Sequence, residues 1–227
     1  MSPSPRTNPL VLLAAALALT SFASLSAAQN VALGLKAGTL GAGLDLTVGL
    51  APVVNLRVGA QAFSYSRTLS EEGISYDGKA DLRSAWLLLD FHPGGKGTRV
   101  SAGGVYSRNK VTGASPSSGT VTVNGVAYPV AAVGSIDGEA TANDVCPYLG
   151  LGWGNAVRPG SPVRFAFDVG VLYQGAPKVS LTAHPRNPAL VPPAFFADLE
   201  KERQKVEDDA SKYKLYPVVN LGLSYRF

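Results

Sequence analysis

Strict alternation of apolar and polar residues runs to the end of the chain. From Tyr213 to Phe227 every odd position is apolar or aromatic, whereas the even positions are mostly polar or small. Side chains of a β-strand point alternately to its two faces, so the pattern predicts one strand with two different faces. Its length of about fifteen residues exceeds the five or six that are usual in globular proteins.

The same alternation recurs along most of the chain. It is clear over 42–50, 54–62, 145–153 and 163–181, and its phase is ambiguous at Leu82–Trp86, where we expect a β-bulge. We predict about eight strands, at 31–38, 42–50, 53–68, 75–91, 98–112, 141–155, 162–182 and 212–227. Short turns rich in proline and glycine alternate with longer polar connections at 69–74, 113–140 and 183–211.

The polar face of these strands carries so many glycines and serines that it would make a poor water-facing surface. It suits a crowded barrel interior, while the apolar, aromatic-tipped face suits lipid. Closure into a barrel also leaves no unpaired strand edge in hydrocarbon. The sequence therefore predicts an all-β fold, a transmembrane antiparallel up-and-down β-barrel of about eight strands. The charges expected inside it are Lys36, Asp45, Arg57, Arg164, Asp168 and Arg226.

Composition agrees with this class. Charged residues make up 16% of the chain, below the roughly 25% of soluble domains. The net charge of +4 is small and forms no basic cluster, so nucleic acid is not an expected partner. A single cysteine, Cys146, excludes an intramolecular disulfide and a cysteine-based zinc cluster.

The first 28 residues predict a cleavable signal peptide. Arg6 precedes a short apolar run from Leu10 to Leu19, and Ser26-Ala-Ala28 supplies the small residues that a signal peptidase recognises. The run is too short for a spanning helix. We therefore expect an outer-membrane β-barrel domain over 29–227, in the cell outer membrane of a Gram-negative bacterium.

The ending Gly222-Leu-Ser-Tyr-Arg-Phe227 resembles the C-terminal recognition strand of bacterial outer-membrane proteins. The chain as a whole resembles the small barrels of the outer-membrane protein A and W types, and 147–155 and 216–227 resemble a proteobacterial family without a settled activity. The resemblance implies handling by periplasmic chaperones and the barrel-assembly machinery. The assembly signal would comprise Gly222, Leu223, Tyr225 and Phe227. Outer-membrane lipids and lipopolysaccharide are the other expected partners.

Two outer connections carry further structure. Asn124-Gly125 lies between alternating residues and predicts a β-hairpin. Residues 194–209 are mostly helix formers and predict a short helix in the last extracellular loop. That helix is a solvated cap, a lid or partner-binding element, or a lipid-dipping segment. The residues that would form a lid are Phe195, Phe196, Leu199 and Val206.

No catalytic, cofactor or metal site emerges from the residues. His184 and Ser180 share a strand face but would lie about 13 Å apart, too far for a nucleophile and its base. We therefore favour a non-enzymatic barrel with a structural or surface-interaction role through its extracellular loops. Two alternatives remain: a narrow porin-like channel for small or hydrophobic solutes, gated by 188–210, and a hydrolase at the rim. Glycines facing the interior favour the channel because they remove bulk.

Overall fold

Eight antiparallel strands close into a barrel in the computed structural model, which describes residues 30–71, 74–185 and 187–227. Around the barrel the order is β1-β2-β3-β4-β5-β10-β11-β13, and β13 pairs again with β1. This confirms the predicted fold class. The strands are β1 (Val31–Gly38), β2 (Gly41–Ala51), β3 (Val54–Glu71), β4 (Ile74–Phe91), β5 (Thr98–Ser107), β10 (Val145–Trp153), β11 (Val163–Tyr173) and β13 (Leu215–Arg226).

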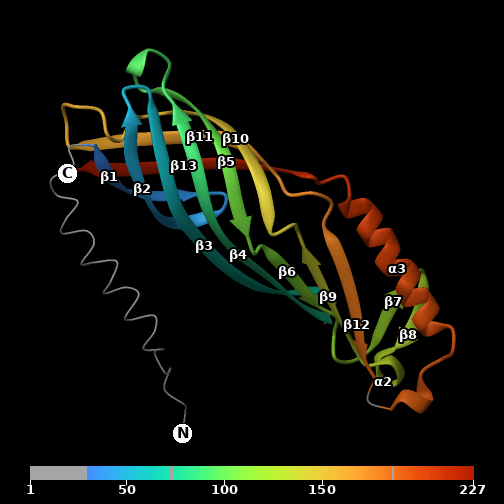
Figure 1. The fold of residues 1–227 in the computed structure, drawn as a ribbon. Coiled ribbons are helices and arrows are strands. Elements are labelled where there is room, and N and C mark those ends of the chain that lie inside the picture. Colours follow the sequence, from blue (N-terminus) through green and yellow to red (C-terminus); the bar gives the residue numbers. More distant parts are fainter. Residues whose placement is uncertain (1–29, 72–73, 186) are drawn as a thin grey trace, which may run out of the picture.

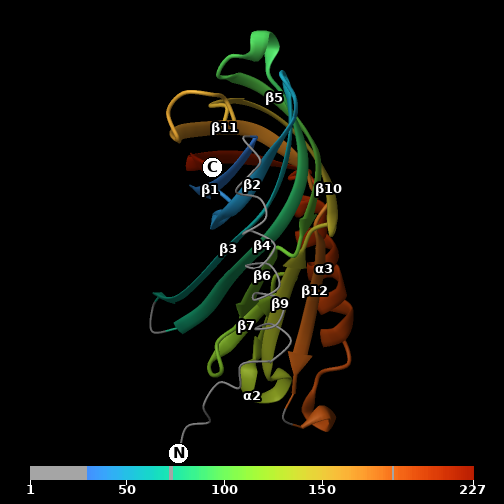
Figure 2. The same cartoon turned by 60° about the vertical axis from the view of Figure 1, so that its left-hand side comes forward.

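The sheet of the barrel continues as a branch, and Figures 1 and 2 show it extending beyond one barrel mouth. The strands β3 and β4 are long enough to leave the barrel, and the far half of β4 pairs with β6 (Lys110–Ala114) instead of β5. The sheet goes on through β9 (Ser135–Thr141) to β12 (Lys178–His184). We call this sheet, ordered β3-β4-β6-β9-β12, the extracellular sheet, after the side of the membrane on which the long connections are expected.

One helix and one small hairpin accompany the extracellular sheet. The hairpin of β7 (Thr120–Val123) and β8 (Val126–Pro129) turns at Asn124 and Gly125, which both have positive φ, as the Asn-Gly signal predicted. The helix α3 (Phe195–Ala210) confirms the helix expected in the last loop. Shorter helical turns are η1 (Pro93–Gly95), α2 (Val130–Val133) and η2 (Pro188–Leu190). Within the described residues, no helix is both long and apolar enough to cross a membrane.

Three strand predictions were wrong in detail. The bulge expected at Leu82–Trp86 is absent, since β3 and β4 pair without a register shift. The pattern there was ambiguous because Trp86 and Leu88 are apolar and yet point inward. The strand expected at 98–112 ends at Ser107 and resumes as β6, and the one at 162–182 divides into β11 and β12 around Gln174–Pro177.

The barrel is apolar outside, and much of its buried interior is polar. On β13, for example, Leu221, Leu223 and Tyr225 are about half exposed, whereas Asn220 and Ser224 are buried. Such an exterior requires a hydrocarbon environment, because water would leave a continuous apolar band exposed. The proposed signal peptide, 1–28, lies outside the described residues.

Candidate functional site

Six buried charges form one network inside the barrel, which we call the polar plug. Three cations, Lys36, Arg57 and Arg99, lie among three carboxylates, Asp45, Asp90 and Asp168. Each of these six residues is at most 8% exposed. Because the charges balance and each one has an ion-pair partner, the network meets the requirement that a buried charge be paired.

Asp168 on β11 is the centre of the polar plug. Its Oδ2 accepts from Lys36 Nζ at 3.2 Å and from Arg57 Nη1 at 3.0 Å, and its Oδ1 accepts from Arg99 Nη2 at 2.7 Å. Arg57 also donates to Asp90 Oδ1 at 2.8 Å, while Lys36 contacts Asp45 Oδ2 at 2.7 Å. The plug therefore ties together strands from all around the barrel wall.

A neutral layer lies next to the polar plug, at the end of the barrel where β1 begins and β13 ends. Asn55 Nδ2 donates to His92 Nε2 at 3.0 Å and to Asn155 Oδ1 at 3.1 Å. The other ring nitrogen of His92 lies 3.2 Å from the carbonyl oxygen of Thr98, so Nδ1 carries the proton. His92 is 1% exposed and serves as a link between strand ends.

The structure places four of the six expected interior charges in the polar plug, namely Lys36, Asp45, Arg57 and Asp168. Arg164 instead lies at the rim and donates to the carbonyls of Arg158 and Pro159, and Arg226 is also only partly buried. Both arginines are partly exposed because they lie at strand ends, beside the turn between β10 and β11. Sequence reasoning missed Asp90 and Arg99. Each directly neighbours a lipid-facing residue, Leu89 or Val100, so the alternation of faces along a strand would have placed both charges inside.

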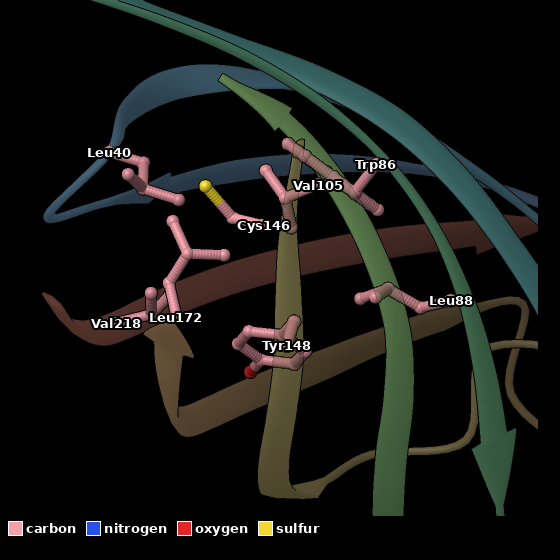
Figure 3. Close-up of a cluster of buried hydrophobic side chains, with 8 residues drawn as sticks. All are labelled: Leu40, Trp86, Leu88, Val105, Cys146, Tyr148, Leu172 and Val218. Carbon is pink, nitrogen blue, oxygen red and sulfur yellow. The ribbon is translucent and has the colours of Figure 1, made fainter. Parts of the chain in front are cut away.

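The other half of the barrel interior is filled by an apolar plug. Side chains from the β1–β2 turn and from five strands converge there, as Figure 3 shows: Leu40, Trp86, Leu88, Val105, Cys146, Tyr148, Leu172 and Val218. Leu172 and Cys146 are fully buried. The interior therefore has a charged layer and an apolar layer stacked along the barrel axis.

The glycines that face the interior do not leave an open path. The space beside Gly150 and Gly170 is taken by the ring of Tyr148, and the space beside Gly59 by Trp86. Two cavities between these side chains measure only about 20 and 10 Å³. The glycines thus make room for large side chains, which removes the argument that favoured a channel.

The helix α3 lies on the extracellular sheet and packs mainly against β12 and β7 (Figure 1). Phe195 and Leu199 are buried in a cluster with Val123, Tyr128, Val133 and Ile136. Of the other residues expected to form a lid, Phe196 and Val206 are exposed. The barrel interior is closed by its own side chains, and the helix packs beside the barrel on the hairpin and on β12.

Polar contacts fix the helix to the hairpin. Asp198 accepts from Tyr128 Oη at 2.7 Å and from Asn124 Nδ2 at 3.0 Å. The hydrogen bond from Tyr128 holds the pKa of Asp198 below its usual range, and the same bond raises the pKa of Tyr128. The helix and hairpin are therefore joined by an ionised carboxylate in addition to apolar packing.

A groove of about 620 Å³ crosses the opposite face of the extracellular sheet. It is lined by hydroxyl and charged side chains, among them Ser66, Lys79, Thr112, Asp137, Glu139, Ser180, Thr182 and His184. His184 Nε2 lies 3.1 Å from Asp137 Oδ2, and both side chains are exposed. Within the described part of the chain, neither Ser180 nor Thr182 hydrogen-bonds to this histidine.

Comparison with known proteins gives similar barrels. No protein-family model and no curated protein matches the chain. The crystal structure of Acinetobacter baumannii CarO2 has 29% identity and a TM-score of 0.58, and covers 87% of this chain and 98% of that one. Acinetobacter baumannii CarO has 25% identity and a TM-score of 0.57 over the same shares. A major outer membrane protein from Thermus thermophilus has 15% identity and a TM-score of 0.41, over 87% and 99% of the two chains.

The chain is an outer-membrane β-barrel protein. Closed single-chain antiparallel barrels with an apolar outside are the form in which strands cross the bacterial outer membrane. The expected assembly signal lies on the last strand, where Leu223, Tyr225 and Phe227 point to the lipid side and Gly222 lies inside against Lys36. Short turns join the strands at the end of the barrel where β1 begins and β13 ends. In barrels of this class the short turns are periplasmic and the long loops extracellular, so we expect the sheet β3-β4-β6-β9-β12 and α3 on the extracellular side.

Proposed function

We propose that this barrel does not conduct solutes and that the protein acts at the cell surface, non-enzymatically, through its extracellular sheet and α3. The filled interior carries the proposal. A polar plug and an apolar plug occupy successive layers of the barrel, and the cavities between them are about 20 and 10 Å³. An eight-stranded barrel has an interior just wide enough for side chains to fill.

The extracellular part is built as a folded binding element. Its sheet, hairpin and helix share an apolar cluster, and its outward face carries a groove of about 620 Å³. Short loops are sufficient to connect the strands of a barrel. A connection with its own sheet, helix and apolar cluster therefore serves a purpose beyond joining strands. A rigid sheet face is a good support for recognition, since little ordering is required on binding.

Conductance in planar lipid bilayers tests the proposal. We expect the folded barrel, residues 29–227, to be silent, and a variant lacking 188–210 to be silent as well, because the plugs lie inside the barrel. Tyr148→Ala combined with Leu172→Ala thins the apolar plug and leaves the polar plug in place, so this variant should also be silent. Heat-modifiable gel mobility would verify that each variant is folded. Discrete channels in the unaltered protein would overturn the proposal, and channels that enlarge without 188–210 would support a gated channel.

A further inference from the structure

The outward face of β4 passes from lipid-facing to polar without any interruption of the strand. Starting at the periplasmic end, it presents Phe91, Leu89, Leu87 and Ala85, and then Arg83, Asp81 and Lys79. The β3–β4 register has no shift, so all seven side chains lie on one face. Arg83 therefore marks the outer limit of the apolar band.

Two arginines meet at this limit. The backbone N–H of Arg108 donates to the carbonyl of Arg83 at 2.7 Å, so the two residues are neighbours across β4 and the β5–β6 junction. Both side chains are exposed. Arg108 Nε donates to the Tyr106 hydroxyl at 2.8 Å, and its guanidinium lies over that ring. Tyr106 thereby orients one guanidinium at the edge of the lipid-facing surface.

Neither arginine of the pair forms a salt bridge within the described residues, although Asp81 acts on Arg83 and Asp144 acts on Arg108 over longer distances, whereas the lysines above the pair are closely paired. Lys79 Nζ lies 2.7 Å from Asp81 Oδ2, and Lys110 Nζ lies 2.7 Å from Glu139 Oε2. Among the described residues, no carboxylate lies within 4.0 Å of a side-chain nitrogen of Arg83 or Arg108. A guanidinium group can donate two parallel hydrogen bonds to two oxygens of one phosphate, which the ammonium group of a lysine cannot do.

The 620 Å³ groove lies on the same outward face, beyond the arginine pair. From Ala62, opposite Arg83, to Thr68 the strand advances about 20 Å, at about 3.3 Å per residue. With the usual tilt of about 40°, the groove is centred about 10 to 15 Å above the lipid band. Its serines, threonines and carboxylates offer the donors and acceptors that bind sugar hydroxyls.

We propose that this face binds one lipopolysaccharide molecule of the outer leaflet. Its acyl chains lie along Leu87 and Leu89, its phosphate groups on Arg83 and Arg108, and its core sugars in the groove. Lipopolysaccharide carries acyl chains, phosphates and sugars in this order, and the face presents apolar, basic and hydroxyl-rich surfaces in the same order. The inference deepens the proposed function, because it names the partner of one face of the extracellular sheet.

Binding of purified lipopolysaccharide to the detergent-folded protein tests the arginine pair. We expect Arg83→Ala with Arg108→Ala to weaken binding about tenfold or more, and Arg83→Lys with Arg108→Lys to give an intermediate loss. Arg158→Ala is the matched control, because it removes an exposed arginine at the periplasmic turn. Dephosphorylated lipopolysaccharide should bind the unaltered protein as weakly as intact lipopolysaccharide binds the double alanine variant. Equal binding of intact lipopolysaccharide to the unaltered and double alanine proteins would overturn the proposal.

A second variant tests the groove. Ser180→Trp fills it from β12, and should weaken binding of lipopolysaccharide with its core sugars while leaving binding of lipid A unchanged. If Ser180→Trp binds lipopolysaccharide with its core sugars as tightly as the unaltered protein does, the groove is not part of the binding site. All these affinities are independent of conductance, so channel formation would refute the closed barrel and leave this result standing. Conversely, a silent barrel that does not bind lipopolysaccharide would refute only the partner.

Discussion

The two halves of the β3–β4 hairpin use their faces in opposite ways. In the barrel half, the outward side chains are apolar, such as Leu56 and Leu87, and the inward ones include the charged Arg57 and Asp90. In the extracellular half, the outward side chains are polar, such as Ser64, which donates to Asp81 at 2.7 Å. The inward ones there include Phe63 and Tyr65, whose rings stack at 6.3 Å.

The inversion follows from a change of solvent along a single pair of strands. Lipid surrounds the barrel half, so charge is favourable only inside. Water surrounds the extracellular half, so its outward face is polar, while the rings of Phe63 and Tyr65 lie about half exposed on the other face. The strand phase never changes, since the register is continuous. The level at which the pattern inverts, between Ala62 and Ser64, therefore locates the membrane boundary more directly than the strand ends do.

The largest effect should come from Asp168→Ala in the barrel half. This change leaves three buried cations with two carboxylates, and removing one partner of a buried ion network costs about 3–5 kcal/mol. Urea unfolding in lipid vesicles, followed by heat-modifiable gel mobility, measures the loss. Asp137→Ala is the extracellular comparison, because its pair with His184 is exposed and should matter far less. Equal losses for the two variants would contradict the contrast between the halves.

The second largest effect should come from a lysine introduced on the outward face, which should lower stability in the barrel half but not in the extracellular half. Leu87→Lys places an ammonium group in the lipid band, which costs about 2 kcal/mol at an intermediate depth. Ser66→Lys makes the same addition to the same face of the extracellular half, where water solvates it, and should leave unfolding unchanged. The same unfolding assay compares the two lysine variants. A comparable cost at Ser66 would place that residue in lipid as well.

The smallest effect should be a local response of α3 to acid. Because the folded-state pKa of Asp198 is lowered by Tyr128, its carboxylate stabilises helix docking above the usual pKa near 3.8, and this is lost as the pH falls through the lowered value. We expect pepsin cleavage within 188–211 to rise as the pH is reduced from about 4.5 to about 2, with the barrel intact on gels. Asp198→Asn should flatten this dependence, and an unchanged slope would exclude Asp198 as its cause.

Alternation along the sequence was sufficient to predict the barrel, because lipid outside and polar groups inside give each strand two unlike faces. The hairpin at Asn124-Gly125 and the helix over 195–210 were also predictable from local signals. Alternation could not show that β12 leaves the barrel, because Val179 and Leu181 alternate just as lipid-facing residues do, but pack towards the helix side.

The composition of the interior was predictable only in part. Same-face spacing brought Lys36, Asp45, Arg57 and Asp168 inside, but it could not show that Asp168 receives three cations, since those contacts join strands far apart in sequence. The apolar plug was missed because Leu172 and Val218 occupy the face expected to be polar. Alternation along one strand shows which side chains point into the barrel. Which side chains touch there depends on how strands that are distant in sequence are arranged around the barrel.

The seam between β1 and β13 joins opposite ends of the chain, from Ala32 with Arg226 to Gly38 with Asn220. Closing so long a loop costs conformational entropy before any contact is gained, so we expect the seam to form last in folding and the local β7–β8 pair early. Time-resolved cross-linking can order the two events, with Leu33→Cys and Tyr225→Cys across the seam and Thr122→Cys and Ala127→Cys across the hairpin. Seam cross-links that precede hairpin cross-links would reverse this order. Until the seam closes, the charged interior has no wall around it, so completion of the last pairing is also the step that makes the protein compatible with a membrane.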